Sequence, residues 1–311
     1  MGSCSAGVEP RVLSIQSHTV HGYVGNKCAV FPLQLFGFDV DAINSVQFSN
    51  HTGYPQFKGQ VMNGEQLWEL IEGLKANNLV HYTHLLTGYI GSPSLLETVV
   101  RVVETLRQYN PHLLYVCDPV MGDHGKLYVK PEMVAAFRDR IVPLASTMTP
   151  NQFEAEQLTG LTIRTEADAL QACQALHDRG PSTVVVTSMF PEGVEDTLLL
   201  VASTTQPQCP QSWPRLKVKV PRKQAYFTGT GDLLSALLLA WTARHPDNLR
   251  LAVEKALAGL QCVLRKTAEA CPEAVAATDR TAEVSRAREL RLVQNGQLLL
   301  DPEIILHAER L

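Results

Sequence analysis

The chain has 311 residues, of which 45% are hydrophobic and 19% charged, and its formal net charge is −4. These values lie in the ordinary globular range and allow a sizeable core, while the absence of a broad basic field argues against nucleic-acid binding. The seven cysteines form no CxxC pair, so neither a zinc knuckle nor a disulfide scaffold is expected.

Neither a targeting segment nor a membrane segment is evident in the sequence. The N-terminal stretch MGSCSAGVEPR lacks the hydrophobic core of a signal peptide, and no apolar run approaches the ~18 residues that a membrane span needs. We therefore expect a cytoplasmic protein without a membrane partner. We also expect a flexible N-terminus at 1–10 and a single domain at 11–311, because no composition shift marks a boundary further along.

Short β-rich runs alternate with longer helical patterns in the first half of the chain. The elements predicted there are a strand at 11–17, a helix at 24–37, a strand at 39–49, a helix at 63–78, a strand at 84–90, a helix from 92 to about 109 and a strand at 113–120. In the helix at 63–78, the apolar residues that share one face by helical spacing are Leu67, Leu70, Ile71 and Leu74.

The second half of the chain continues this alternation. The predicted elements are strands at 183–188, 198–203 and 215–220, surface loops at 203–215 and 271–287, and two long helices, one directly after Asp232 and one over 248–270. Strands that alternate with helices indicate a parallel sheet covered on both faces. The predicted fold is therefore α/β, a three-layer α/β/α sandwich around a central, mostly parallel sheet.

The stretch FTGTGD at 227–232 is followed directly by the apolar run LLSALLLAWT. One interpretation is a tight turn with Asp232 at a helix N-terminus, where negative charge is favourable. The other is an anion hole, because glycines expose consecutive N–H groups and a helix N-terminus adds positive potential. The sequence lacks G-x-x-x-x-G-K-[ST] and the third glycine of a dinucleotide fingerprint, which disfavours both of those phosphate sites. An anion hole that contains an acid fits better.

Polar residues end several of the predicted strands, and ligands of parallel sheets bind at the carboxyl ends of the strands. These strand-end residues are Ser17, Tyr89, Asp118, Thr149 and Thr187. Four acids would ring the same sheet edge and supply the oxygen ligands that a Mg²⁺–nucleotide complex requires: Asp118, Asp123, Glu154 and Asp232. Local roles are the alternative, with Asn151 and Glu154 as a capping-box variant and the aspartates of DPVMGD as turn formers.

GTGD at a helix start, preceded by N-x-x-E near mid-chain, resembles the ribokinase-like superfamily of small-molecule kinases. Longer segments narrow the resemblance to the pyridoxal kinase family, close to its animal members: LSIQSHTVHGYVGN at 13–26, NSVQFSNHTGYPQFKGQV at 44–61, LTGY at 86–89, VCDPVMGD at 116–123, TPNQFEAEQLTG at 149–160, LLSALLLAW at 233–241 and DPEI at 301–304. The resemblance runs from about residue 11 to 305.

This resemblance implies a ribokinase-like fold, a homodimer and an ATP-dependent kinase with pyridoxal-type vitamers as substrates. The implied reaction phosphorylates the 5′-hydroxymethyl group of pyridoxal, pyridoxine and pyridoxamine, giving pyridoxal 5′-phosphate and related vitamers. Mg²⁺, or alternatively Zn²⁺, is the implied divalent cation, and K⁺ or Na⁺ the implied activator.

The resemblance also implies roles for individual residues, with Asp232 as the general base and Gly229 in the anion hole. The positions that match the substrate site are Ser17, Val46, Thr52, Tyr89, Gly229 and Asp232. The positions that match the ATP site are Asp118, Tyr128, Asn151, Gln152, Phe153, Glu154, Thr187, Ser188, Lys223, Gln224, Ala225, Thr230 and Gly231. The acids Asp123 and Glu154 match positions that organise Mg²⁺. The matches to the ligands of the monovalent cation are Asp118, Thr149 and Thr187.

Two segments depart from the family pattern. The animal enzymes usually carry a longer, Trp-containing segment after GD, whereas here HGKL leads directly to Tyr128. In addition, Gln224 stands where the family usually has an acidic residue. Two alternatives stay open at this point: a hydroxymethylpyrimidine-type kinase of the same fold, and a catalytically silent relative that binds pyridoxal phosphate.

Overall fold

The computed structural model describes residues 9–222, 225–277 and 281–311. Most of the N-terminus that was predicted to be flexible, residues 1–8 of 1–10, lies outside the described residues. The predicted ATP-site residues Lys223 and Gln224 also lie outside them.

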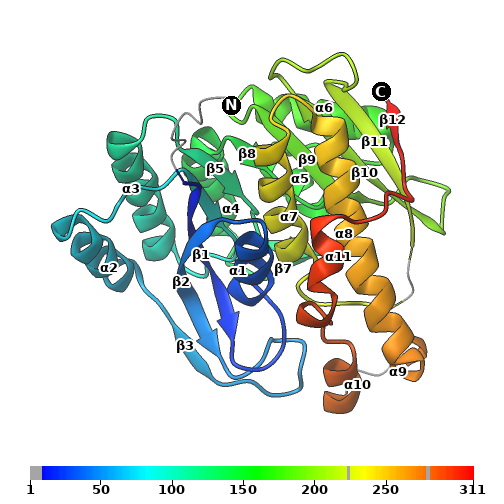
Figure 1. The fold of residues 1–311 in the computed structure, drawn as a ribbon, viewed down its shortest axis with the longest axis horizontal. Coiled ribbons are helices and arrows are strands. Elements are labelled where there is room, and N and C mark those ends of the chain that lie inside the picture. The colour runs from blue at the N-terminus through cyan, green and yellow to red at the C-terminus, as the bar shows by residue number, and fades with distance from the viewer. Residues whose placement is uncertain (1–8, 223–224, 278–280) are drawn as a thin grey trace, which may run out of the picture.

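A ten-stranded sheet runs through the middle of the described chain (Figure 1). Its strands are β1 (Arg11–Thr19), β2 (Asp39–Phe48), β3 (Gly59–Val61), β4 (His84–Thr87), β5 (Leu114–Cys117), β8 (Thr147–Met148), β9 (Thr183–Met189), β10 (Thr197–Thr204), β11 (Arg215–Pro221) and β12 (Ala308–Arg310). Their spatial order is β12-β11-β10-β9-β8-β5-β4-β1-β2-β3. The strands from β9 across to β2 pair in parallel, whereas β3 and the strands from β10 to β12 pair antiparallel. The predicted mostly parallel sheet is confirmed.

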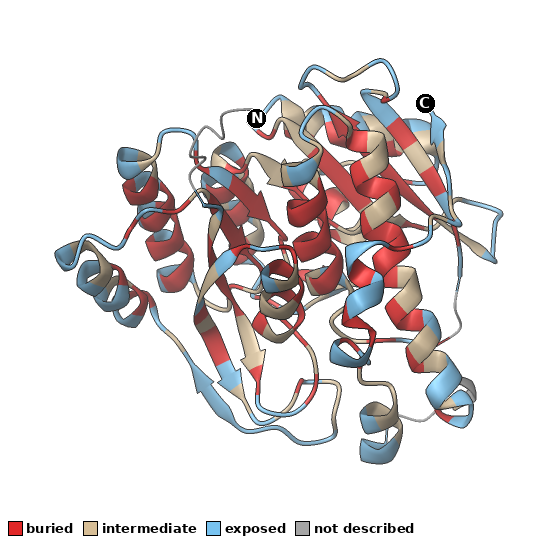
Figure 2. Ribbon diagram, in the orientation of Figure 1, coloured by how far each residue is buried: buried red, intermediate tan, exposed pale blue. Residues whose placement is uncertain are grey.

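Helices cover both faces of this sheet. They are α1 (Asn26–Leu35), α2 (Gly64–Ala76), α3 (Pro93–Tyr109), α4 (Glu132–Ala136), α5 (Gln152–Thr159), α6 (Glu166–His177), α7 (Thr230–Arg244), α8 (Leu249–Ala270), α9 (Pro272–Ala276), α10 (Ala282–Ala287) and α11 (Gly296–Leu300), with short helical turns at Phe137–Ile141, Val142–Leu144 and Val293–Asn295. Helices α1, α7, α8 and α11 contribute to one core cluster on one face of the sheet, and helices α2 to α6 contribute to a second cluster on the other face. The buried parts of these helices and of the sheet are red in Figure 2. The predicted three-layer sandwich is confirmed.

Strand β1 contributes side chains to both core clusters and leads to the candidate site at its carboxyl end. Successive side chains of a strand point to opposite faces, so Leu13 and Ile15 enter one core cluster while Val12 enters the other. Further along the face of Val12, the strand turns polar, and the buried Ser14 hydroxyl donates a 2.8 Å hydrogen bond to Asn26 Oδ1. This contact fixes the first turn of α1 against the sheet, just below the carboxyl end of β1.

The helix predicted at 63–78 is confirmed as α2, which buries Leu67 and Ile71 and leaves Leu70 46% exposed. One local prediction is wrong in part. The segment 271–287 is not a loop throughout, since it contains α9 and α10. The loop predicted at 203–215 is confirmed over the stretch between β10 and β11. Among the described residues, we find no helix with both the length and the apolar character to cross a bilayer.

Candidate active site

The FTGTGD stretch forms the start of α7. Gly229 is the residue that precedes the helix, and its φ of 84° lies in the left-handed region that favours glycine. A Cβ at this position would collide with the backbone carbonyl of Tyr23 and would lie 2.9 Å from Cys28 Sγ. The close approach of the turn to the segment before α1 therefore requires glycine.

Asp232, in the first turn of α7, lies beside the N-terminus of a second helix. The backbone N–H of Gly25, the residue preceding α1, donates a 2.8 Å hydrogen bond to Asp232 Oδ2. Burial raises the pKa of Asp232, and the hydrogen bond from Gly25 opposes part of that rise. Both helix N-termini carry positive potential toward this carboxylate. The two chain segments thus place one acid at the point where an anion would bind.

Gly25 is a site residue that the sequence interpretation missed. Its φ is 51°, and a Cβ would collide with the backbone carbonyl of Ser17 at the carboxyl end of β1. The signal that marks it is a glycine directly before the polar start of a predicted helix, which lets the chain enter α1 close to β1. Ser17, Gly25 and Asp232 are consequently neighbours.

Two further acids, Asp118 and Glu154, are buried near Asp232. Burial raises the pKa of Asp118 well above its usual range, and the charges of Glu154 and Asp232 raise it further. Burial likewise raises the pKa of Glu154 to about 8, against the opposing effect of hydrogen bonds from backbone N–H groups. Among the described residues, the donors to these three acids are backbone amides and one hydroxyl. None of these donors is a basic side chain, so none of them carries a positive charge that would balance the three acids.

These three acids suit a cation that arrives bound to a ligand. Buried carboxylates that raise one another's pKa are stabilised in their charged forms by a nearby positive ion. Within the described ranges, however, three such side chains nowhere converge closely enough to hold a metal by themselves. Mg²⁺ usually keeps several waters and binds through one or two carboxylates together with substrate phosphates, so the arrangement suits Mg²⁺ with a nucleotide.

Glu154 has a structural role as well as a place in the acidic group. Its backbone N–H donates to Asn151 Oδ1 and its Oε2 accepts from the Asn151 N–H, both at 2.9 Å, which completes a capping box at the start of α5. Its Oε1 accepts from the Met121 N–H at 3.0 Å. The local alternative drawn from N-x-x-E is confirmed, and the same side chain also fixes the segment after β5.

The shortened segment after Asp123 is a tight β-hairpin of β6 (Gly122–Asp123) and β7 (Lys126–Leu127). Its turn residues His124 and Gly125 have φ values of 47° and 75°, the positive values that two-residue type I′ turns require. Asn151 Nδ2 donates a 2.8 Å hydrogen bond to the Gly122 carbonyl and attaches the hairpin to α5. The trimmed loop thus still carries Asp123 beside Glu154, whose pKa it raises.

The remaining predicted ATP-site residues surround this hairpin or the strand ends beside it. Tyr128 follows the hairpin, half exposed, and its pKa is raised by burial, by Tyr226 and by the charges of Asp123 and Glu154. Phe153 packs against the hairpin, since a Cβ at Gly122 would lie 2.6 Å from its ring. The other members lie at the end of β9 (Thr187 and Ser188), in the segment before α7 (Ala225) and in the first turn of α7 (Thr230 and Gly231).

The side chain of Gln152 is committed to structure. Its Nε2 donates to the Ile163 carbonyl at 2.7 Å, and its Oε1 accepts from the Phe190 N–H at 2.8 Å. Both ends of the amide therefore join the start of α5 to other loops. An ATP contact of Gln152 would have to come from its backbone.

Two of the three residues predicted to bind the monovalent cation, Asp118 and Thr149, contact a serine that the sequence analysis did not select. Ser235 Oγ donates to Asp118 Oδ2 at 3.1 Å and lies 2.8 Å from Thr149 Oγ1, and all three residues are buried. The third predicted ligand, Thr187, instead bonds the Pro150 carbonyl through its N–H at 2.9 Å. The available signal was the position of Ser235 three residues after Asp232, which places both on one side of α7.

On the other side of the turn, the predicted substrate residues gather at the carboxyl ends of β1, β2 and β4. A bulge shifts the register between Gln16 and Ser17, so that Ser17 pairs with Val46. The bulged residue Ser45 donates a 2.8 Å hydrogen bond to the Tyr89 carbonyl, which brings Tyr89 to the same edge. A bulge beside an active site re-aims side chains, and here it gathers Ser17, Val46 and Tyr89.

Thr52 lies in the loop of residues 49–58 between β2 and β3, which we name the β2–β3 loop. Thr52 itself is exposed, but its neighbours His51 and Gly53 approach the FTGTGD turn. A cleft between them is lined by His51, Gly53, Tyr226, Thr228, Ser285 and Arg288. The β2–β3 loop, the FTGTGD turn and α10 therefore meet around one opening.

Known proteins resemble this chain in both sequence and fold. A family model described as phosphomethylpyrimidine kinase matches residues 71–275. Pyridoxal kinase of Arabidopsis thaliana is 57% identical over 302 residues, covering 96% of this chain and 94% of the relative. Pyridoxal kinase of Sus scrofa is 48% identical over 309 residues, covering 96% and 95%. Among solved structures, pyridoxal kinase from Leishmania donovani in complex with ADP and pyridoxamine matches with a TM-score of 0.86 at 39% identity, covering 97% of this chain and 99% of that chain.

Proposed function

Because the chain belongs to the pyridoxal kinase family, we propose that it transfers the γ-phosphoryl group of ATP to the 5′-hydroxymethyl group of pyridoxal, pyridoxine and pyridoxamine. The observation that carries this proposal is the position of Asp232, held by the Gly25 N–H at the start of α7 and flanked by Asp118 and Glu154. The Leishmania relative is described with ADP and with pyridoxamine or pyridoxine, and these are the two substrate classes that such a site would bring together.

Asp232 acts as the general base in this proposal. Phosphoryl transfer depends mainly on alignment and on stabilisation of charge, so the protein must orient the alcohol and take up its proton as the new O–P bond forms. Gly25 occupies Asp232 Oδ2, which leaves Oδ1 to face the substrate hydroxyl. The pKa raised by burial makes the carboxylate a better proton acceptor than an exposed aspartate.

The turn before α7 binds the phosphoryl group that is transferred. The N–H groups of residues 229–231 and the N-terminus of α7 are fixed in position before the reaction, so they stabilise the phosphoryl oxygens without reorganising. On the vitamer side, Ser17 and Thr52 hydrogen-bond the polar substituents of the pyridine ring, and Val46 and Tyr89 form its walls. The bulge that gathers Ser17, Val46 and Tyr89 supports this assignment.

The acids bind cations in the proposed complex. Asp123 and Glu154 would hold Mg²⁺, or Zn²⁺ in its place, together with water and phosphate oxygens, and the divalent ion would offset the phosphate charge. Asp118, Thr149 and Thr187 would hold K⁺ or Na⁺ nearby. The raised pKa of Asp118 and of Glu154 supports both assignments, because buried charge of one sign favours ions of the other.

Two wider properties remain predictions, one from the family resemblance and one from the sequence itself. One is a homodimer, which light scattering on the purified chain would test. The other is a cytoplasmic site of action, which cell fractionation would test.

The decisive experiment incubates the chain with pyridoxal, MgATP and K⁺ and identifies pyridoxal 5′-phosphate by its absorbance and mass, with Asp232→Asn as the control. We expect product from the wild-type chain and almost none from the variant. Hydroxymethylpyrimidine is assayed in parallel, because the matched family model is described by that chemistry. Preferred turnover of hydroxymethylpyrimidine, or tight binding of pyridoxal phosphate without turnover, would contradict the proposal.

A further inference from the structure

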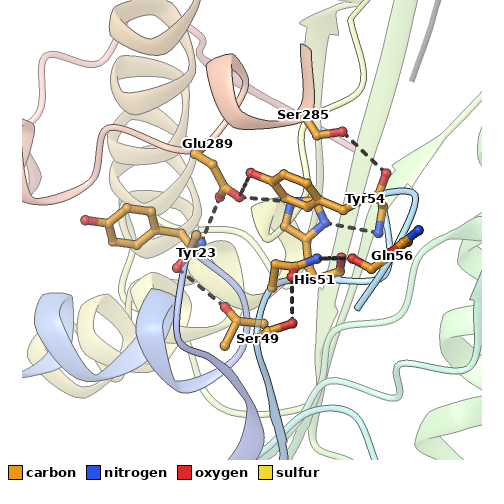
Figure 3. Close-up of polar contacts among 11 residues, drawn as sticks. Tyr23, Ser49, His51, Tyr54, Gln56, Ser285 and Glu289 are labelled. Carbon is orange, nitrogen blue, oxygen red and sulfur yellow. Dashed lines mark hydrogen bonds and ion pairs between the residues drawn. The ribbon is translucent and has the colours of Figure 1, made fainter. Parts of the chain in front are cut away.

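Glu289, just after α10, is shielded from water and accepts three hydrogen bonds from two distant parts of the chain (Figure 3). Its Oε1 lies 3.1 Å from His51 Nε2 and accepts from the Tyr54 hydroxyl at 3.0 Å. Its Oε2 accepts from the Tyr23 N–H at 2.9 Å. The His51 and Glu289 side chains are only 8% and 11% exposed, so these contacts are largely screened from water.

The contact with His51 fixes the orientation of that imidazole. The Gly53 N–H donates to His51 Nδ1 at 3.1 Å, so Nδ1 acts as an acceptor and the proton resides on Nε2, facing Glu289. A side chain at Gly53 would crowd the same ring, because a Cβ would lie 2.8 Å from Nδ1. Glu289 thereby selects both the tautomer and the direction of a residue that lines the cleft.

The same carboxylate also fixes the turn that leads to Asp232. Tyr23, whose N–H bonds Glu289, precedes Gly25 by two residues, and the Gly25 N–H bonds Asp232. A Cβ at Gly22, which has a φ of 90°, would collide with the Glu289 carboxylate. One side chain thus joins the turn at 22–25 to the β2–β3 loop.

Two other contacts attach α10 itself. Ser285 Oγ donates to the Gly53 carbonyl at 3.4 Å, at the same loop. Arg288 Nε donates to the Ala274 carbonyl at 2.9 Å, which ties α10 to the segment of α9. The segment that carries Glu289 is therefore attached both to the β2–β3 loop and to α9. Glu289 is consequently able to hold the β2–β3 loop in place.

We propose that Glu289 is a positioning residue for the vitamer, which sets the geometry of the β2–β3 loop through His51 and Tyr54 and supports the Gly25–Asp232 contact through Tyr23. This inference rests on the proposed function. It assigns a role mainly in binding the vitamer, because His51 and Tyr54 belong to the loop that carries Thr52, whereas Asp118, Glu154 and the hairpin lie on the nucleotide side.

The test is Glu289→Gln, with KM measured separately for pyridoxal and for ATP. A glutamine has a single acceptor oxygen and cannot serve His51, Tyr54 and Tyr23 together. We expect the KM for pyridoxal to rise at least tenfold and kcat to fall several-fold, while the KM for ATP stays within twofold.

Glu254→Gln is the matched control. Glu254 is a buried carboxylate that accepts the Ala308 N–H at 2.9 Å and pairs with Arg250, so it also ties the C-terminal part of the chain to a helix, but at the far edge of the sheet. We expect this variant to lose stability without changing either KM more than twofold.

A folded Glu289→Gln variant with an unchanged KM for pyridoxal, or with both KM values raised alike, would overturn the inference. If that variant fails to fold, Tyr54→Phe removes one donor to Glu289, and a threefold or larger rise in the KM for pyridoxal alone is expected. An unchanged KM in Tyr54→Phe would then overturn the inference. A wild-type chain that does not phosphorylate pyridoxal would instead refute the proposed function, so the two failures are distinguishable.

Discussion

Asp118 and Glu154 on the nucleotide side and Glu289 on the vitamer side are all shielded from water, yet the pKa values of the first two shift in the opposite direction to that of Glu289. Burial and neighbouring negative charge raise the pKa of Asp118, and burial raises that of Glu154 to about 8. The pKa of Glu289 is lowered, because hydrogen bonds from His51, Tyr54 and the Tyr23 N–H outweigh the effect of burial.

This difference shows how the two halves of the site are completed. On the vitamer side, the partners of the buried charge belong to the chain itself, and the geometry of the loop exists before the substrate arrives. On the nucleotide side, the donors to Asp118, Glu154 and Asp232 are backbone amides and one hydroxyl and include no charged side chain, so we propose that a cation entering with the nucleotide stabilises their charged forms. The first half is preorganised and the second is completed by its ligand.

The largest expected effect comes from Asp232, which lies between the two halves. Asp232→Asn keeps the shape of the side chain but removes the base, and we expect kcat to fall about 10²–10⁴-fold. Because burial raises the pKa of this carboxylate, the folded protein prefers it uncharged, and the melting temperature of the variant should equal or exceed that of the wild type. Steady-state kinetics and thermal unfolding measure both. A variant with most of its turnover would remove Asp232 from the mechanism.

The second prediction concerns stability as a function of pH. A carboxylate whose pKa is lowered in the folded state contributes stability above its ordinary value of 4.5, and the contribution disappears as the pH falls through the lowered pKa. Glu289→Gln should cost about 2 kcal/mol at pH 7, or about 4 °C in melting temperature. The difference from wild type should shrink below pH 4.5. A difference that grows in acid would contradict the charged network with His51 and Tyr54.

A smaller effect is expected from the hairpin on the nucleotide side. At Gly125, φ is 75° and no atom crowds the position, so Gly125→Ala adds only backbone strain of about 1–2 kcal/mol. Since the hairpin carries Asp123, we expect the KM for ATP to rise about fivefold and the KM for pyridoxal to stay constant.

Gly37→Ala is the control for this variant. Gly37 has a φ of 87° and equally open surroundings, but it lies between α1 and the amino end of β2, whereas the hairpin follows the carboxyl end of β5. It should destabilise the protein without changing either KM. A rise in the KM for pyridoxal in Gly125→Ala would show that the two sides are not independent.

The smallest change is expected from Ser235→Ala, which removes the hydroxyl between Asp118 and Thr149. The K⁺ concentration for half-maximal activity should rise about threefold, which corresponds to about 0.7 kcal/mol, the net contribution of one ordinary hydrogen bond. Turnover at saturating K⁺ should stay within twofold of wild type. K⁺ titrations of the initial rate would measure this, and an unchanged midpoint would separate Ser235 from the cation site.

Sequence alone predicted the parts of the molecule that are set by local patterns. FTGTGD begins a helix because its glycines and its acid act within one turn. Asp118 and Thr149 meet because parallel strands end at one edge of a sheet. The His124–Gly125 turn was not predicted, because the strands on either side of it have only two residues each and show no alternating pattern.

The rest depends on contacts between distant segments. Tyr23 and Glu289 are 266 residues apart in the chain, and no periodicity links them. Helices α9 and α10 have 5 and 6 residues, too few to show a helical repeat, so the segment at 271–287, just before Glu289, was predicted as a loop. The exposure of Leu70 likewise depends on how α2 leans on α3, which no local pattern specifies.

The central claim is spatial, and a crystal structure of the chain with pyridoxal and a non-hydrolysable ATP analogue tests it most directly. We predict that the 5′-hydroxyl oxygen lies within about 3.2 Å of Asp232 Oδ1, with the terminal phosphate against the N–H groups of residues 229–231. A vitamer whose 5′-hydroxyl faces away from Asp232 while the phosphate occupies the turn would contradict the account.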